Sequence, residues 1–286
     1  MKIGICGSSF PPGTDPSEMF RVAKDAGFDG IEPNFTAEGP VSLKSGEDDL
    51  RRYREAAARA GLEIPSVAGG LYWSTPFTSD DPAVRSRAIE IARAHLKAAS
   101  ALGAKSVLIV PGVVHAFFVP NCPVVRYDLA WERALAAMRQ IAPLAEELDV
   151  HIGVENVWNK FLMSPLEIGR FVDEVGSTHV GVYLDVGNVV PFGFPQDWIA
   201  VLGKRIRKVH VKDFKADASL QNMAGFVDIL QGDVNWPAVI GALREIGYDD
   251  YLTAEMIPHY RYRPLQRVYN TAASLRAILK EESRPW

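Results

Sequence analysis

The sequence has few cysteines and no long apolar runs. Its 286 residues include two cysteines, Cys6 and Cys122, which are too few for a disulfide framework or a zinc cluster. No stretch approaches the roughly 18 apolar residues of a membrane-spanning helix. The first ten residues, MKIGICGSSF, also lack the apolar run of a signal peptide. We therefore expect no membrane partner and a location in the reducing cytoplasm.

An excess of positive charge is also missing. The chain has 31 Lys and Arg against 35 Asp and Glu, a net charge of -4 and a pI near 5.9. Nucleic acid binding needs a basic face, so we expect no nucleic acid partner. The remaining composition, 48% hydrophobic and 23% charged, is that of an ordinary globular protein with a large core. Because the sequence lacks a linker or low-complexity tract, we interpret residues 1–286 as one domain.

Short β-rich segments alternate with helical patterns along the chain. The predicted strands are residues 2–6, 28–34, 62–70, 104–112, 150–156, 179–188, 206–214 and 251–256. The predicted helices are residues 16–27, 47–61, 81–103, 127–148, 164–176, 195–203, 235–247 and 264–282. Such alternation favours parallel strands, and eight units in about 250 residues are typical of a TIM barrel. No GxGxxG motif follows the first strand, which disfavours a dinucleotide-binding open sheet. The predicted fold is α/β, a single (β/α)8 TIM barrel.

Four of these strands end in, or carry, a side chain that can bind a metal ion. Glu155, Asp185, His210 and Glu255 belong to the fifth to eighth predicted strands. A single acid at a strand end is usually a turn or surface residue, but in a barrel these four ends meet at one mouth. Three clustered carboxylates would repel one another and raise their own pKa values. A divalent ion such as Mn²⁺, Mg²⁺ or Co²⁺ suits three carboxylates and one imidazole, so we predict a metal site here.

At these residues the chain resembles a known family. The segments GVENVWNKF, GVYLDVGNV, KVHVKDF, GDVNWPAV and TAEM are similar to those of the xylose-isomerase-like sugar phosphate isomerase/epimerase superfamily of TIM barrels. Within this superfamily, the chain looks like members of the hexulose-6-phosphate isomerase and L-ribulose-5-phosphate 3-epimerase group. The resemblance implies that Glu155, Asp185, His210 and Glu255 hold one divalent metal ion, Mn²⁺ first, with Mg²⁺, Co²⁺ or Zn²⁺ as alternatives. It also implies a small sugar or sugar phosphate as the partner, and a homodimer or homotetramer.

The resemblance further implies an acid–base role for two of the ligands. In the ketose 3-epimerases of this superfamily, the residues that match Glu155 and Glu255 flank the substrate carbon from opposite faces. A proton next to a carbonyl is weakly acidic, and its removal gives an enediolate that a metal ion stabilises. We therefore expect a metal-dependent isomerase or epimerase of a ketose or ketose phosphate, with 3-epimerisation favoured.

Other functions remain open at this point. A metal-dependent lyase or dehydratase of the inosose dehydratase type, acting on a keto-sugar or cyclitol, would share the first proton removal. Cleavage of a keto-glycoside is a related alternative. An endonuclease-like hydrolase normally needs more histidine ligands, and only His210 of the six histidines stands at a clear ligand position. A non-catalytic sugar-binding barrel would not need all four ligands.

Residues near the predicted mouth are candidates for substrate contacts. Loops after barrel strands read substrates, and Asn188 stands where ketose 3-epimerases of free sugars often have a histidine, which suggests different polar contacts. The predicted substrate-binding residues are Glu32, Asn34, His115, Trp158, Lys160, Asn188 and Lys212. Asp213 is predicted to orient His210 as a hydrogen-bond partner behind the metal site.

Overall fold

The strands form a curled parallel sheet. A computed structural model describes residues 1–216 and 223–281. Seven strands pair in the order β2 (Gly30–Glu32), β1 (Lys2–Cys6), β11 (Tyr251–Ala254), β8 (Ile206–Val211), β7 (Val180–Asp185), β6 (His151–Glu155) and β5 (Ser106–Ile109). Every pair in this sheet is parallel. The carboxyl ends of all these strands therefore lie at the same end of the sheet.

The segment 63–69 joins the two edge strands of this sheet. Glu63 forms a parallel bridge with Gly30 of β2, and Val67 forms one with Val107 of β5. β3 (Asn34–Phe35) pairs with β4 (Ala68–Gly69) in a separate parallel sheet. The predicted strand 62–70 is therefore reduced to these short pairings. Pro65 lies in its middle and has no N–H to donate to a ladder, which explains the interruption.

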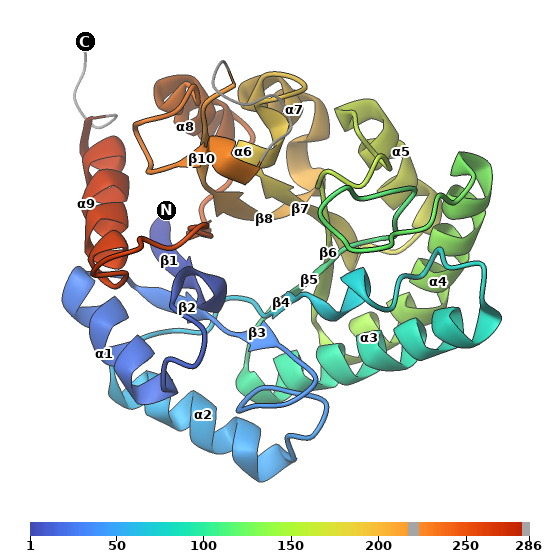
Figure 1. Ribbon diagram of the computed structural model, residues 1–286, viewed down its shortest axis with the longest axis horizontal. Coiled ribbons are helices and arrows are strands. Elements are labelled where there is room, and N and C mark those ends of the chain that lie inside the picture. Colours follow the sequence, from blue (N-terminus) through green and yellow to red (C-terminus); the bar gives the residue numbers. More distant parts are fainter. Residues whose placement is uncertain (217–222, 282–286) are drawn as a thin grey trace.

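Helices surround the strands, as Figure 1 shows. Eight of them correspond to the predicted helices: α1 (Pro16–Ala26), α2 (Glu47–Arg59), α3 (Pro82–Leu102), α4 (Tyr127–Leu148), α5 (Pro165–Val175), α7 (Pro195–Leu202), α8 (Trp236–Glu245) and α9 (Gln266–Glu281). Residue 282, the predicted last residue of α9, lies outside the described residues. The predicted α/β barrel fold is confirmed, whereas the single-domain organisation stays a prediction.

Local sequence signals set the helix ends. The N-cap residues Asp15, Asp81 and Ser164 each accept a hydrogen bond from a backbone N–H two or three residues later, which satisfies a donor of the first turn. Each cap is followed by a proline in the first turn. Gly103 ends α3 with φ of 76°, a left-handed conformation that glycine adopts without a steric penalty.

Two small elements at the carboxyl end of the sheet depart from the predicted pattern. α6 (Val186–Val189) begins directly after β7, with Asp185 as its N-cap. The predicted strand 206–214 is divided, because β9 (Asp213–Phe214) leaves the barrel and pairs antiparallel with β10 (Phe226–Val227). Across residues 1–216 and 223–281, no helix has both the length and the apolar character needed to cross a bilayer.

Candidate metal and catalytic site

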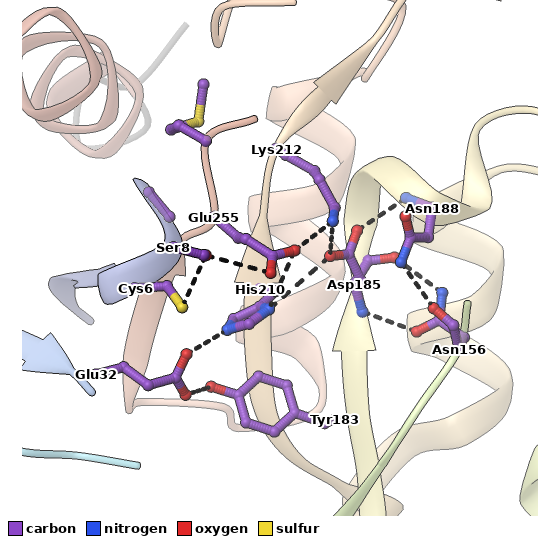
Figure 2. Close-up of polar contacts among 12 residues, drawn as sticks. Cys6, Ser8, Glu32, Asn156, Tyr183, Asp185, Asn188, His210, Lys212 and Glu255 are labelled. Carbon is purple, nitrogen blue, oxygen red and sulfur yellow. Dashed lines mark hydrogen bonds and ion pairs between the residues drawn. The ribbon is translucent and has the colours of Figure 1, made fainter. Parts of the chain in front are cut away.

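Four side chains from adjacent strands meet at the carboxyl end of the sheet. Glu155 ends β6, Asp185 ends β7, His210 lies in β8 and Glu255 follows β11. Each offers one potential ligand atom, and these atoms all lie within 4.8 Å of one another. Asp185 and His210 are fully buried, whereas 21% of the Glu255 side-chain surface is exposed. In Figure 2 the Asp185 and Glu255 carboxylates converge on the His210 ring.

Strand register brings Asp185 and His210 side by side. The two residues are direct partners in the β7–β8 ladder. The register shifts by one residue between Val182 and Tyr183, because β8 places Arg207 as an extra residue at this point. Paired residues point their side chains to the same face of a sheet, so the bulge determines which β8 side chain meets Asp185.

Asn156 and Asn188 hold the Asp185 backbone and carboxylate. The Asn156 side chain accepts a hydrogen bond from Asp185 N at 2.8 Å and donates one to Asp185 O at 2.9 Å. The Asn188 side chain donates to the Asn156 carbonyl at 3.0 Å. Asp185 Oδ1 accepts from Asn188 N at 2.8 Å, as the cap of α6. One carboxylate oxygen is thus occupied, and the other, Oδ2, faces His210.

Burial and mutual repulsion determine the ionisation of the carboxylates. Burial raises the pKa of Glu155 to about 8, and the charge of Glu255 adds to the rise. Burial also raises the pKa of Asp185. Burial alone would raise the pKa of Glu255, but the charges of Lys212 and His210 outweigh it and lower that pKa to about 2. Placing several carboxylates here is costly without a proton or a cation to compensate.

Two buried atoms at the centre of the cluster have no hydrogen-bond partner in the described part of the chain. They are His210 Nδ1 and Asp185 Oδ2, the second of which forms an ion pair with Lys212 Nζ at 3.0 Å. The two atoms are 4.0 Å apart, and Glu255 Oε2 is 3.9 Å from His210 Nδ1. Buried polar atoms without partners are rare. Carboxylate oxygens with one imidazole suit a divalent ion such as Mn²⁺, so the residues present fit such an ion.

Lys212 brings a positive charge to the same carboxylates. Its Nζ lies 2.5 Å from Glu255 Oε2 and 3.0 Å from Asp185 Oδ2, and 5.0 Å from the centroid of the Phe226 ring. Burial lowers the pKa of Lys212, but the two carboxylates outweigh burial and raise it above its usual value. The buried amine is therefore charged at neutral pH.

A cavity of about 130 Å³ opens beside these groups. Polar groups line one part of it, from Glu155, Glu255, Asn188 and Lys212. The other lining residues are mainly aromatic or aliphatic: Trp73, Phe118, Val157, Trp158, Met223, Phe226 and Ile257. Apolar walls exclude water and strengthen electrostatic interactions inside a site. The cavity thus combines a charged floor with walls that suit the carbon skeleton of a small polar molecule.

The family of the chain is established by sequence comparison. A family model described as "Xylose isomerase-like TIM barrel" matches residues 20–281. The chain belongs to this family. The predicted resemblance is thereby confirmed, and the four clustered side chains lie in a barrel of known type.

Individual relatives of this xylose isomerase-like barrel are distant. The 2-epi-5-epi-valiolone 7-phosphate 2-epimerase of Actinoplanes sp. is 27% identical over 210 residues, 72% of this chain and 70% of the relative. The L-ribulose-5-phosphate 3-epimerase UlaE of Salmonella paratyphi C is 22% identical over 258 residues, 86% of this chain and 84% of the relative. A structure of D-psicose 3-epimerase with D-tagatose from Clostridium cellulolyticum superposes with a TM-score of 0.80 at 18% identity, covering 99% of this chain and 100% of that chain.

The predicted substrate-binding residues lie in different parts of this family fold. Trp158, Asn188 and Lys212 line the cavity beside the clustered carboxylates. Lys160 is exposed on the following loop, away from the lining of that cavity. His115 is half-buried in the loop after β5, and its backbone N–H donates to Asn159 O at 3.1 Å.

Asn34 lies at the β1–β2 side of the mouth. Its Oδ1 accepts a hydrogen bond from the Cys6 thiol at 3.4 Å. It lines a second cavity of about 370 Å³, together with Ser8 and His259. Ser8 connects the two regions, because its Oγ donates to Glu255 Oε1 at 3.4 Å.

Glu32 and Asp213 lie in environments that differ from those predicted. Glu32 is fully buried, and its two oxygens contact Tyr183 and His210 instead of facing the cavity. Asp213 accepts hydrogen bonds from Leu230 N at 3.0 Å and Trp236 Nε1 at 3.1 Å. Asp213 thus holds the loop before α8, and Glu32 is the residue that contacts the far side of His210.

Asn156, Tyr183 and Ser8 also contact the site residues but were not predicted from the sequence. A signal was present for two of them, because Asn156 directly follows Glu155, and Tyr183 precedes Asp185 by two residues. Residues two apart in a strand point to the same face, so Tyr183 shares the interior face with Asp185. Ser8 lies in a short helical turn, Gly7–Ser9, that follows β1.

Proposed function

We propose that this chain is a divalent-metal-dependent epimerase of a ketose or ketose phosphate, with C3 as the preferred centre. The observation that carries the proposal is the convergence of Glu155, Asp185, His210 and Glu255 beside a small cavity. The names of the relatives support it, because they are 2-epimerases and 3-epimerases of cyclitol or sugar phosphates and of a free ketose.

The proposed metal site uses the four clustered side chains as ligands. A bound divalent ion, Mn²⁺ in first place, would polarise the substrate carbonyl and stabilise negative charge on its oxygen. His210 Nδ1 has no hydrogen-bond partner among the described residues, and the potential ligand atoms of the three acids lie within 4.8 Å of it, which supports this assignment.

The two glutamates are the proposed acid–base pair. In the sheet order β6–β7–β8–β11, Glu155 and Glu255 belong to the outer two strands, with Asp185 and His210 between them. They therefore approach the cavity from different sides. One glutamate would remove the proton next to the carbonyl, and the other would return a proton to the opposite face. Positioned groups of this kind typically contribute about 10²–10⁴-fold to the rate.

The cavity lining suggests how a sugar would be held. The Trp158 indole donates to Asn188 O at 2.9 Å and stacks on Phe226 with ring centroids 5.0 Å apart. This rigid aromatic wall can pack on the carbon face of a sugar. Lys212 and Asn188 can bind its oxygens, and the charge of Lys212 would also favour a developing enediolate.

The proposal is tested by solvent exchange. Protein loaded with Mn²⁺ is incubated in D₂O with ketoses, ketose phosphates and keto-sugars, and NMR identifies the carbon that exchanges and the products. Deuterium at C3 with a C3 epimer is the expected result, and it is lost in the Glu155→Gln and Glu255→Gln variants. Elimination products would identify a lyase instead, and no exchange with any compound would overturn the ketose proposal.

A further inference from the structure

Glu32 belongs to a chain of hydrogen bonds inside the barrel, behind the clustered metal-binding groups. Its Oε2 is 2.6 Å from His210 Nε2, and its Oε1 accepts a hydrogen bond from the Tyr183 hydroxyl at 2.5 Å. The Tyr183 oxygen is 3.1 Å from Ser66 Oγ. All four side chains are fully buried, and Figure 2 shows Glu32 on the side of His210 opposite to Asp185.

The chemistry of a carboxylate decides what Glu32 does to the imidazole. An ionised carboxylate only accepts hydrogen bonds, so the proton in the 2.6 Å contact belongs to His210 Nε2. The other ring nitrogen, Nδ1, faces Asp185 and Glu255 at 4.0 and 3.9 Å. Nδ1 is therefore the nitrogen that is available as a ligand.

We propose that Glu32 is a positioning residue, which fixes the orientation of the His210 ring and keeps Nδ1 as the metal-binding nitrogen. This inference rests on the proposed metal-dependent function. A carboxylate that accepts from the far nitrogen of a ligand histidine also makes the near nitrogen a better electron donor. Glu32 would thus act on a bound metal through His210, because in the described part of the chain its two oxygens contact Tyr183 and His210 and it is absent from the cavity lining.

Tyr183 holds Glu32 in place and limits the movement of His210. The Tyr183 and His210 rings contact each other edge to face, with centroids 4.6 Å apart. The Tyr183 ring crosses the barrel interior over Gly153, where an added Cβ would lie 2.9 Å from Tyr183 Cβ and Cδ2. Glycine at this position on β6 therefore makes room for the tyrosine that supports Glu32.

The test measures metal binding directly and needs no substrate. Mn²⁺ affinity of the metal-stripped full chain is obtained by EPR titration, and Co²⁺ absorption reports the ligand geometry. Glu32→Gln keeps the size of the side chain but removes its charge. We expect its Mn²⁺ dissociation constant to rise about 10–100-fold, with a changed Co²⁺ spectrum. An unchanged dissociation constant and spectrum would overturn the inference.

A matched control separates positioning from general stability. Glu63 also accepts a hydrogen bond from a tyrosine, Tyr251, at 2.8 Å, but it lies beside Lys2 at the amino end of β1. Glu63→Gln is expected to leave the Mn²⁺ affinity and the Co²⁺ spectrum unchanged, and an equal loss in both variants would overturn the inference.

Folding failure and loss of metal binding are distinguished by further measurements. If Glu32→Gln fails to fold by circular dichroism, Tyr183→Phe replaces it, with a smaller but measurable loss of Mn²⁺ affinity expected. Wild-type affinity in Tyr183→Phe would then overturn the inference. If the wild-type chain binds no Mn²⁺, the proposed function and this inference both fail. If the wild type binds Mn²⁺ and the variants bind equally well, only this inference fails.

Discussion

Replacing Glu155 with glutamine should stabilise the metal-free protein and reduce the stabilisation that a bound metal ion provides. Burial and the nearby Glu255 raise the pKa of Glu155 from 4.5 to about 8. A carboxyl group whose pKa is higher in the folded than in the unfolded state lowers the unfolding free energy at pH values above its unfolded pKa. For Glu155 this loss is about 3 kcal/mol at pH 7. Glutamine has no such cost. The metal-free Glu155→Gln variant should therefore exceed the wild type by up to about 3 kcal/mol in unfolding free energy.

The increase in unfolding free energy that Mn²⁺ causes should be smaller in the variant than in the wild type. A ligand at 100 times its dissociation constant stabilises the folded state by about 2.7 kcal/mol. At this Mn²⁺ concentration, the unfolding free energy of the wild type should rise by about 2.7 kcal/mol. The rise for Glu155→Gln should be clearly smaller, because the variant loses one proposed ligand. The assay is urea unfolding followed by circular dichroism, at pH 7 with EDTA or with Mn²⁺, and again in EDTA at pH 4.5. At pH 4.5 the metal-free difference should fall to about 0.4 kcal/mol.

The control for this comparison is Glu147→Gln, at an exposed position on α4. It should behave as the wild type in each condition. The reasoning would be refuted if the metal-free Glu155→Gln variant were no more stable than the wild type at pH 7. It would also be refuted if Mn²⁺ stabilised the variant and the wild type equally.

Three other predictions concern the framework of the site. Asn156→Ala leaves the buried N–H and C=O of Asp185 without the partners at 2.8 and 2.9 Å, and should lower the unfolding free energy by about 2–4 kcal/mol in urea titrations. Gly187→Ala places a methyl group 2.8 Å from the Lys212 carbonyl oxygen. This clash should lower the unfolding free energy by about 1–3 kcal/mol and weaken Mn²⁺ binding in EPR titrations. Wild-type stability and affinity would contradict the close packing at this position. Burial lowers the pKa of His95 from 6.5 to about 4. Between pH 7 and pH 5 this histidine is therefore protonated in the unfolded chain but not in the folded one, and the unfolding free energy falls by about 2 kcal/mol. A pH series of urea unfolding curves should show a smaller decrease for His95→Gln.

The barrel and the cluster of four potential metal ligands could be predicted from sequence because both follow from local patterns. Strand–helix alternation indicates parallel strands, and parallel strands in a barrel bring their carboxyl ends together. Glu155 and Asp185 each end a strand, so their proximity required no knowledge of distant contacts. The same strand pattern placed His210 and Glu255 at this end, and the family resemblance then implied one shared role for all four side chains.

Contacts across the barrel interior were less predictable. Asp213, which follows His210 at the end of the predicted strand, was expected to orient it. The residue that contacts the far side of His210 in the structure is Glu32, which is 178 residues away in sequence. Which side of the imidazole each acid reaches depends on the β-bulge near Tyr183 and on the closure of the barrel. The exit of β9 from the barrel takes Asp213 to the loop before α8, and hydrophobic alternation gives no sign of that exit.

The central claim is that Glu155, Asp185, His210 and Glu255 bind one divalent ion. Its most direct test is anomalous diffraction at the manganese edge from crystals grown with Mn²⁺. The account predicts one strong peak for each chain, coordinated by His210 Nδ1 and by oxygens of the three carboxylates. The absence of a peak at these four side chains, or a single peak elsewhere in the chain, would contradict the account.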